Sequence, residues 1–261
     1  MLRKIQIAID FLFYFFTAGN KHSVHSPFVF DFVTRVLEAR KNKPTYHAIE
    51  LLRSKMLKSN STLEVLPLGA ASGKKPKREK LRNVVKRTSK SAKYAELLER
   101  ICHYYQPQYA VEIGSSVGIS TLYQASGITQ GYLFSLEGNP GSVRIARHNA
   151  EKLEYLHIQF IEGMFEQTLP MLLEQLPRVD YVFFDGNHTL EATLHYFEEC
   201  LQKAHSGSIF VFDDIRWSEG MQRAWQKIKN HPRVKVTIDL YFMGIVFFRT
   251  EQDKEHFILR F

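Results

Sequence analysis

Acidic side chains stand at the ends of several short apolar runs, which the sequence pattern indicates to be buried strands. These ends carry Glu112, Glu137, Asp185 and the pair Asp213 and Asp214. A single carboxylate in such a position is also explained as the cap of the next helix. Several carboxylates on one edge of a sheet would repel one another, so we expect a metal ion or a cationic ligand among them.

A glycine turn follows the first of these runs, in the sequence YAVEIGSSVGIST of residues 109–121. Gly114 and Gly118 let the backbone turn tightly and approach a ligand, and the start of the next helix offers free N–H groups. Dinucleotide sites prefer G-x-G-x-x-G, but Ser116 stands at the second glycine position here. With Glu112 ahead of the turn, the pattern favours a cationic ligand that carries an amino group over a pyrophosphate.

The elements that position these groups are strands alternating with helices, from about residue 94 to the end of the chain. Such alternation predicts a doubly wound, mostly parallel α/β sheet, in which ligands bind beyond the carboxyl ends of the strands. Glu137 follows the glycine turn by roughly 20 residues, a spacing at which a carboxylate accepts hydrogen bonds from ribose hydroxyls. The expected strands are residues 109–113, 132–136, 157–161, 180–184, 208–212, 234–238 and 242–248.

These motifs resemble those of the class I S-adenosylmethionine-dependent methyltransferases, and in particular the small O-methyltransferase-like branch related to the catechol and caffeoyl-CoA enzymes. The resemblance covers about residues 94–249 and rests on the sequences VEIGSSVGIST, SLEGN, DYVFFDGNH and FVFDD. It implies a Rossmann-like sheet of seven strands, whose last strand, 242–248, runs antiparallel beside the fifth, 208–212. It also implies an enzyme that transfers a methyl group from S-adenosylmethionine, with a small-molecule hydroxyl as the expected acceptor.

The same resemblance assigns the walls of the cofactor site. Glu112 and the glycine turn would surround the methionine part of S-adenosylmethionine, and Glu137 would hold the ribose. In the family an acid usually stands where this chain has Met164, and it contacts the adenine amino group, so adenine recognition departs from the family pattern here. The implied cofactor-binding residues are Glu112, Gly114, Ser115, Ser116, Gly118, Glu137, Gly138, Gly163, Met164 and Asp185.

Two ways of removing the proton of the acceptor are open. In the first, which the resemblance implies, Asp185, Asp213 and Asp214 bind Mg²⁺ or another divalent cation, which lowers the pKa of the acceptor hydroxyl. In the second, no metal binds and His188 accepts the proton, because an imidazole titrates near neutral pH. Asp185 and His188 are therefore the expected catalytic residues, although a histidine three residues after Asp185 is equally explained by a structural role.

The positive charge of the chain is local. The net charge is +8, but residues 74–93 hold ten basic residues and one acid, so the rest of the chain is close to neutral. This basic segment raises the alternative of a nucleic-acid or protein methyltransferase. Nucleic acid is not the favoured partner, because Asp-Gly-Asn-His at 185–188 differs from the Asn/Asp-Pro-Pro-aromatic sequence of amino-methylating families. A cofactor-binding protein without methyl transfer is a third alternative.

The first 93 residues lie outside the resemblance. We divide the chain into an N-terminal helical extension with a basic linker, residues 1–93, and a methyltransferase domain, residues 94–261. The extension is expected to form a lid over the ligand edge, with a flexible linker at 69–73, for which a phosphate cradle is the weaker alternative. The apolar run near the N-terminus contains Gln6 and Asp10 and is shorter than the ~20 residues that span a bilayer, so we expect an amphipathic or core-docked helix and no transmembrane segment.

Composition places the chain among ordinary globular proteins, with 44% hydrophobic and 24% charged residues. Its two cysteines have neither metal-ligand nor redox spacing, which fits a reducing cytosol and a cytoplasmic location. The aromatic run 241–248 would allow pairing across a homodimer.

Overall fold

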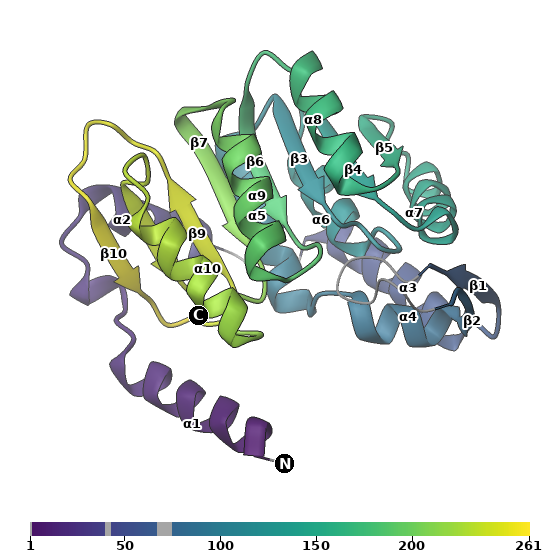
Figure 1. The fold of residues 1–261 in the computed structure, drawn as a ribbon, viewed down its shortest axis with the longest axis horizontal. Coiled ribbons are helices and arrows are strands. Elements are labelled where there is room, and N and C mark those ends of the chain that lie inside the picture. Colours follow the sequence, from purple (N-terminus) through teal and green to yellow (C-terminus); the bar gives the residue numbers. More distant parts are fainter. Residues whose placement is uncertain (1, 40–42, 67–74) are drawn as a thin grey trace.

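The fold is organised around one sheet of eight strands with helices on both faces (Figure 1). The structure is a computed structural model, and it describes residues 2–39, 43–66 and 75–261. The strand order is β10-β8-β9-β7-β6-β3-β4-β5. The strands of this sheet are β3 (Tyr109–Ile113), β4 (Tyr132–Glu137), β5 (Ile158–Glu162), β6 (Val179–Phe184), β7 (Ala204–Phe212), β8 (Val236–Asp239), β9 (Gly244–Phe247) and β10 (Glu255–Ile258).

The seven strands that the sequence predicts are all present. The antiparallel direction of β9 beside β7 is confirmed, and β9 is also antiparallel to β8. The other neighbouring strands of the sheet are parallel. The predicted number of seven is wrong by one, because β10 adds an edge strand beside β8. Its sequence, EHFI, has only two apolar residues, so its pattern is not typical of a buried strand.

Alternate residues of the central strands face opposite layers of helices. Ala110 of β3 belongs to the core on one face, whereas Val111 belongs to the core on the other, and Phe183 and Phe184 of β6 divide in the same way. Because both faces are buried, these strands are nearly continuous apolar runs. One face packs against α5 (Ala92–Tyr105) and α6 (Ile119–Gly127), and the other against α8 (Phe165–Gln175), α9 (Leu190–Leu201) and α10 (Glu219–Asn230), which lie in front of the sheet in Figure 1.

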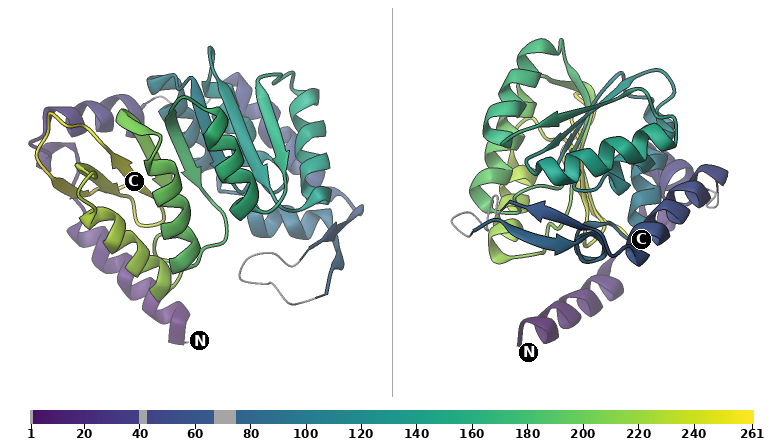
Figure 2. Two further views of the ribbon diagram at one scale, coloured as in Figure 1. Left: turned by 45° about the horizontal axis from the view of Figure 1, so that its top comes forward. Right: turned by 90° about the vertical axis from the view of Figure 1, so that its right-hand side faces the viewer.

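The N-terminal extension packs against this framework and does not form a separate body (Figure 2). Phe28 and Phe32 of α2 (Pro27–Phe32) place their rings against Phe247 of β9, so α2 lies on a face of the sheet. A third core joins Ile49 and Val84 of the extension to α6 and α7 (Pro140–Lys152). The elements of the extension are α1 (Leu2–Thr17), η1 (Lys21–Ser23), α2 (Pro27–Phe32), η2 (Val33–Leu37), α3 (Pro44–Lys58), β1 (Thr62–Val65), β2 (Lys77–Lys80) and α4 (Leu81–Thr88).

The basic segment is built into regular structure where the structure describes it. Residues 77–80 form β2, which pairs antiparallel with β1, and residues 81–88 form α4, which buries Leu81, Val84 and Val85. The linker expected at 69–73, with its alternative of a phosphate cradle, lies outside the described residues. From β2 onward the basic segment is therefore an ordered part of the fold, and it leads directly into α5.

Helix α1 projects from the rest of the molecule in both figures (Figures 1 and 2). Tyr14 of this helix is buried, packs on Tyr241 and donates a hydrogen bond from its hydroxyl to the carbonyl oxygen of Leu259. Phe13 and Phe16 of the same helix are exposed. Within the described part of the chain, no helix combines the length and the hydrophobicity that crossing a bilayer requires.

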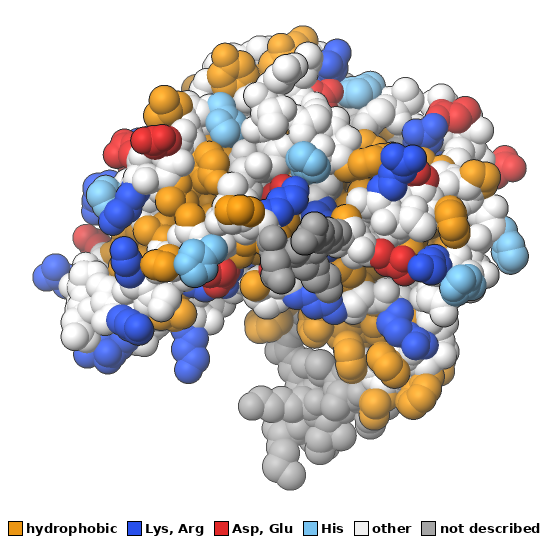
Figure 3. Space-filling view, turned by 180° about the vertical axis from the view of Figure 1, so that it is seen from behind, with side chains coloured by type: hydrophobic (Ala, Val, Ile, Leu, Met, Phe, Trp, Pro, Cys, Tyr) orange, Lys and Arg blue, Asp and Glu red, His pale blue; other side chains and the backbone are white. Residues whose placement is uncertain are grey.

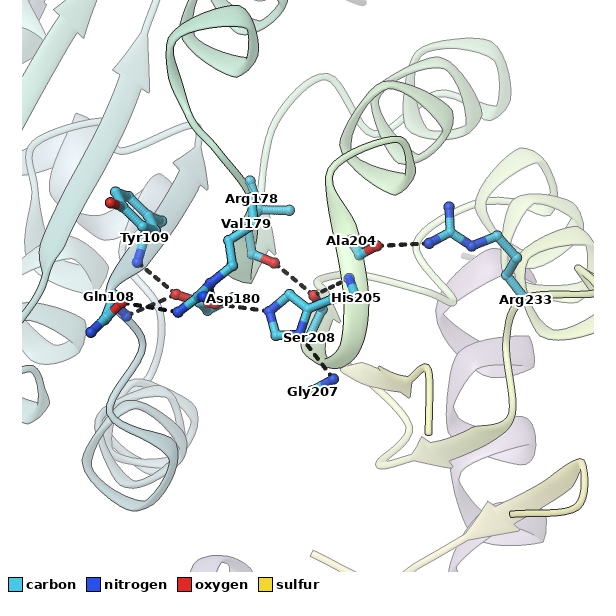
Figure 4. A network of polar contacts seen from close by, with 10 residues as sticks. All are labelled: Gln108, Tyr109, Arg178, Val179, Asp180, Ala204, His205, Gly207, Ser208 and Arg233. Carbon is cyan, nitrogen blue, oxygen red and sulfur yellow. Dashed lines mark hydrogen bonds and ion pairs between the residues drawn. The ribbon is translucent and has the colours of Figure 1, made fainter. Parts of the chain in front are cut away.

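A polar network joins the amino ends of β3, β6 and β7 (Figure 4). Asp180 accepts hydrogen bonds from the N–H groups of Gln108 and Tyr109, each at 2.9 Å, and from Nε2 of His205 at 2.8 Å. Burial raises the pKa of Asp180, but the hydrogen bonds from Tyr109, His205 and Arg178 outweigh burial and lower it overall. This carboxylate links the starts of β3, β6 and β7 at the edge opposite to the predicted ligand edge.

Asp180→Asn is expected to lower the free energy of unfolding at pH 7 by about 1–3 kcal/mol, because the charge-assisted hydrogen bonds weaken. The folded-state pKa of Asp180 is depressed, so its contribution is present above the unfolded pKa of roughly 4 and is lost as the pH falls through the folded value. Denaturant unfolding at pH 7 and under acid conditions measures the difference, which should shrink in acid. Asp253→Asn, in an exposed loop, is the matched control; an equal loss in both variants would contradict the role of the network.

Candidate active site

The carboxyl ends of β3 and β6 meet at the point where the strand order reverses, which is where ligands bind in open α/β sheets. The N–H of Asp185 donates to the carbonyl oxygen of Ile113 at 2.9 Å. Gly114 follows with φ +98°, and a Cβ there would lie 2.6 Å from the carbonyl oxygen of Asp185. At Gly118, with φ +87°, a Cβ would lie 2.9 Å from Cβ of Ala146. Both glycines of the motif are therefore required by close backbone or helix contacts.

Glu137 joins the glycine turn to the ends of β4 and β5. Its carboxylate accepts hydrogen bonds from the N–H of Ser116 at 2.7 Å and from the N–H of Asn139 at 2.8 Å. Its carbonyl oxygen accepts from the N–H of Gly163 at 3.1 Å. Burial raises the pKa of Glu137, and the backbone hydrogen bonds only partly offset that effect. The structure thus brings Glu137 and its neighbour Gly138 to the turn.

Two polar groups of the turn have different surroundings. The hydroxyl of Ser115 is buried, and it has no hydrogen-bond partner among the described residues. Ser116 has φ +47°, and its hydroxyl lies 2.7 Å from the hydroxyl of Thr88, the last residue of α4. A buried hydroxyl without a partner is costly, so Ser115 is available to a ligand. Met164 precedes α8 next to Gly163 and is exposed.

Glu112 lies beneath the turn and not on its surface. The side chain is fully buried, and its two carboxylate oxygens accept four side-chain hydrogen bonds. Burial raises the pKa of Glu112 to about 7, hydrogen bonds lower it, and the charge of Asp185 adds to the increase. We therefore expect Glu112 to act on a cofactor through the position of the turn rather than by direct contact. The four donors are Ser120, Thr121, Gln124 and Ser135.

A strained loop after β6 presents the expected catalytic pair. Asn187 and His188 have φ values of +62° and +21°, which non-glycine residues rarely adopt. Strain of this kind clusters at functional sites. The Nε2 atom of His188 lies 3.4 Å from Oδ1 of Asp185, and both side chains are partly exposed. The imidazole is therefore held beside a carboxylate at the switch point.

Asp213 and Asp214 have separate positions although they are adjacent in sequence. Within the described ranges, Asp185, His188 and Asp213 bring ligand atoms to within 4.8 Å of one another, and Asp214 is not part of this group. Asp214 has φ +53°, and its carbonyl oxygen accepts from the N–H of Trp217 at 2.8 Å. Of the three expected metal ligands, the structure brings Asp185 and Asp213 together, and His188 joins them in place of Asp214.

Lys90 lies at the centre of the site, although the sequence motifs do not single it out. Its Nζ pairs with Oδ2 of Asp213 and lies 3.2 Å from Oδ1 of Asp185. The residue belongs to the basic segment, where nine other basic side chains give the same local signal. No pattern within the segment distinguishes it, because its partners lie 95 and 123 positions later in the chain.

Other basic residues of the segment also have partners within the fold. Arg87 and Lys77 both pair with Glu79, and Arg82 donates to Oδ1 of Asn60 at 3.0 Å. Seen from the back of the molecule, the basic side chains of the described residues are scattered among apolar and acidic ones (Figure 3). These observations give no support to the alternative of a nucleic-acid methyltransferase, which stays a prediction.

The buried Glu112 predicts a pH-dependent stability. Since its folded pKa is raised to about 7, the folded state holds a proton that the unfolded state releases above its pKa of roughly 4. The contribution of Glu112 to stability therefore falls as the pH rises from about 4 to about 7, by on the order of 3 kcal/mol.

Glu112→Gln removes this titration while keeping a similar shape. Thermal unfolding at pH 5 and pH 8 should show that the variant gains stability relative to the wild type at the higher pH. Glu154→Gln serves as a control, because its side chain is on a surface turn. A constant difference between Glu112→Gln and the wild type at both pH values would show that Glu112 does not titrate in this range.

Comparisons with known proteins agree with the geometry. Residues 111–215 match a family model described as a methyltransferase domain. A search of curated proteins found no match. Similar solved structures include an O-methyltransferase from Bacillus cereus in complex with SAH, which is 18% identical with a TM-score of 0.57, over 84% of this chain and 96% of that chain.

Two further structures extend this comparison. The O-methyltransferase TomG from Streptomyces achromogenes, involved in tomaymycin synthesis and in complex with SAM, is 16% identical with a TM-score of 0.58, over 84% of this chain and 95% of that chain. An SAH-bound methyltransferase from Podospora anserina is 14% identical with a TM-score of 0.60, over 87% of this chain and 97% of that chain. At these identities the likeness shows the fold. Residues 111–215 therefore match a methyltransferase domain, and the fold of the chain is that of these solved methyltransferases.

Proposed function

We propose that this protein transfers the methyl group of S-adenosylmethionine to an oxygen atom of a small-molecule acceptor. The observation that carries the proposal is the meeting of the glycine turn, Glu137 and the Asp185–His188 pair at the switch point of the sheet. Two of the similar solved structures are described as O-methyltransferases. We also propose a cytoplasmic location and a homodimer, although β9, which lies within the aromatic run 241–248, pairs with β7 and β8 and offers no free edge to a second copy.

The residues at the turn fit the proposed cofactor. Near the ends of β3 and β4, the hydroxyl of Ser115 has no partner in the part of the chain that the structure describes and can donate a hydrogen bond to a ligand, and the carboxylate of Glu137 can accept one. Gly114 and Gly163, with φ +98° and +146°, keep the backbone free of side chains there. When bound, S-adenosylmethionine supplies a methyl group that its sulfonium already activates. The chain therefore has to hold the acceptor in line and to accept one proton.

His188 is proposed to accept that proton at Nδ1. Its Nε2 lies 3.4 Å from Oδ1 of Asp185, so Nε2–H would face the carboxylate, which would stabilise the imidazolium that forms. His188, with a positive φ, stands on a loop that also contains Asp185. General-base catalysis of this kind contributes roughly 10²–10⁴-fold to a rate.

Gly114→Ala is expected to weaken cofactor binding strongly. The added Cβ would lie 2.6 Å from the carbonyl oxygen of Asp185, and the residue would keep a strained φ of +98°. Isothermal titration of the full-length protein with S-adenosylmethionine and with NAD measures the effect. Gly207→Ala at the opposite edge of the sheet, with a φ outside the strained region, is the matched control. Binding of NAD alone by the wild type would overturn the proposed function.

His188→Ala is expected to bind S-adenosylmethionine like the wild type but to lose about 10²–10⁴-fold in turnover. The assay measures transfer of a labelled methyl group to catechol and to a panel of phenols, using the acceptor that the wild type methylates fastest. His195→Ala, on the exposed side of α9, should behave like the wild type. Full turnover in His188→Ala would exclude His188 as the proton acceptor.

A further inference from the structure

The side chain of Lys90 lies between two acidic strand ends. Its ammonium contacts Oδ2 of Asp213 and is 3.2 Å from Oδ1 of Asp185. The side chains of Lys90, Asp185 and Asp213 are 15%, 11% and 3% exposed, so water screens this ion pair only weakly. Removing one member would leave a shielded charge without a counterion.

The backbone of Lys90 is anchored on both sides. Its carbonyl oxygen accepts a hydrogen bond from Nη1 of Arg53 on α3, and Arg53 in turn pairs with Glu50 at 3.0 Å. Two residues earlier, Thr88 contacts the hydroxyl of Ser116 in the glycine turn at 2.7 Å. Lys90 therefore reaches the site from a segment that is fixed against both the third helix and the cofactor turn.

A divalent cation does not fit the site in this arrangement. An ion between Asp185 and Asp213 would lie beside the ammonium of Lys90, and two positive charges at such a distance repel strongly. Mg²⁺ also prefers an octahedral set of oxygen ligands. The group that the described residues form offers two carboxylates and one imidazole, without Asp214.

We propose that Lys90 is the resident cation of this site and that its ammonium takes the place of a divalent metal. The proposal rests on the proposed methyl transfer, and it assigns the acceptor to hydroxyl compounds whose oxygen accepts a hydrogen bond from Lys90. An ammonium has three N–H donors, of which Asp185 and Asp213 take two. The third is directed to the acceptor oxygen, and the positive charge stabilises that oxygen as His188 takes its proton.

Manganese binding by the full-length protein tests this proposal without an acceptor. Titration with Mn²⁺, monitored by electron paramagnetic resonance, should show no saturable site in the wild type. Lys90→Ala leaves two carboxylates and His188 without their cation, so it should bind one Mn²⁺ at least about tenfold more tightly than the wild type. The double variant Lys90→Ala, Asp213→Asn should lose this gain. A structural role of Lys90 alone would not create a metal site.

Two further variants serve as controls. Lys86→Ala removes an exposed charge from the same basic segment and should bind no Mn²⁺. Lys90→Arg keeps the cation and should also exclude Mn²⁺. If Lys90→Ala does not fold, the uncharged Lys90→Gln replaces it. Saturable Mn²⁺ binding by the wild type that Asp213→Asn abolishes, or no gain of binding in the uncharged variants, would overturn the proposal.

Titration with S-adenosylmethionine separates this proposal from the proposed function. Failure of the wild type to bind S-adenosylmethionine would overturn the methyl transfer, whereas the Mn²⁺ titration reports on Lys90 alone. Where an acceptor is methylated, turnover in excess EDTA should equal turnover without it. Loss of turnover in EDTA, restored by Mg²⁺, would contradict the role of Lys90.

Discussion

Compensation of negative charge at the carboxyl edge of the sheet is the constraint on which the arrangement of this site depends. Removing a carboxylate from water costs free energy unless hydrogen bonds or an opposite charge replace the lost hydration. The chain solves this in three ways. Glu112 is surrounded by hydroxyl and amide donors, Glu137 receives backbone N–H groups, and Asp185 and Asp213 share the ammonium of Lys90. The three arrangements therefore give these carboxylates different surroundings near the edge.

The N-terminal extension is part of this compensation. Its helix α2 packs on a face of the sheet through Phe28 and Phe32, away from the carboxyl edge, whereas Thr88 and Lys90 reach the turn and the acidic strand ends. If the extension acts as a lid, we therefore expect that action from the segment after α4 rather than from the first helices. The division of the chain at residue 93 separates Lys90 from its partners in sequence, although the two parts share one site.

Much of the fold could be predicted because buried strands are apolar on both faces, which makes them recognisable one by one. Edge strand β10 lacks that property, since two of its four residues, 255–258, are polar and three are exposed. The position of Glu112 was harder to predict for a different reason. An acid within a strand can face a ligand or the core, and the donors that bury it stand up to 23 positions away. The partners of Lys90 lie still farther along the chain, so the local sequence pattern does not indicate that Lys90 belongs to the site.

Two histidine–aspartate pairs of the sheet show that a candidate for proton transfer is identified by its position in the fold before the distance between its side chains. His205 and Asp180 are 2.8 Å apart, closer than His188 and Asp185 at 3.4 Å, and by contact alone the first pair would be the better candidate for proton transfer. The first pair, however, joins the starts of strands, where the carboxylate of Asp180 accepts hydrogen bonds from backbone N–H groups. The second stands on a strained loop at the switch point, beside a cation and a glycine turn. Only the second pair lies where an open α/β sheet can bring a ligand to it.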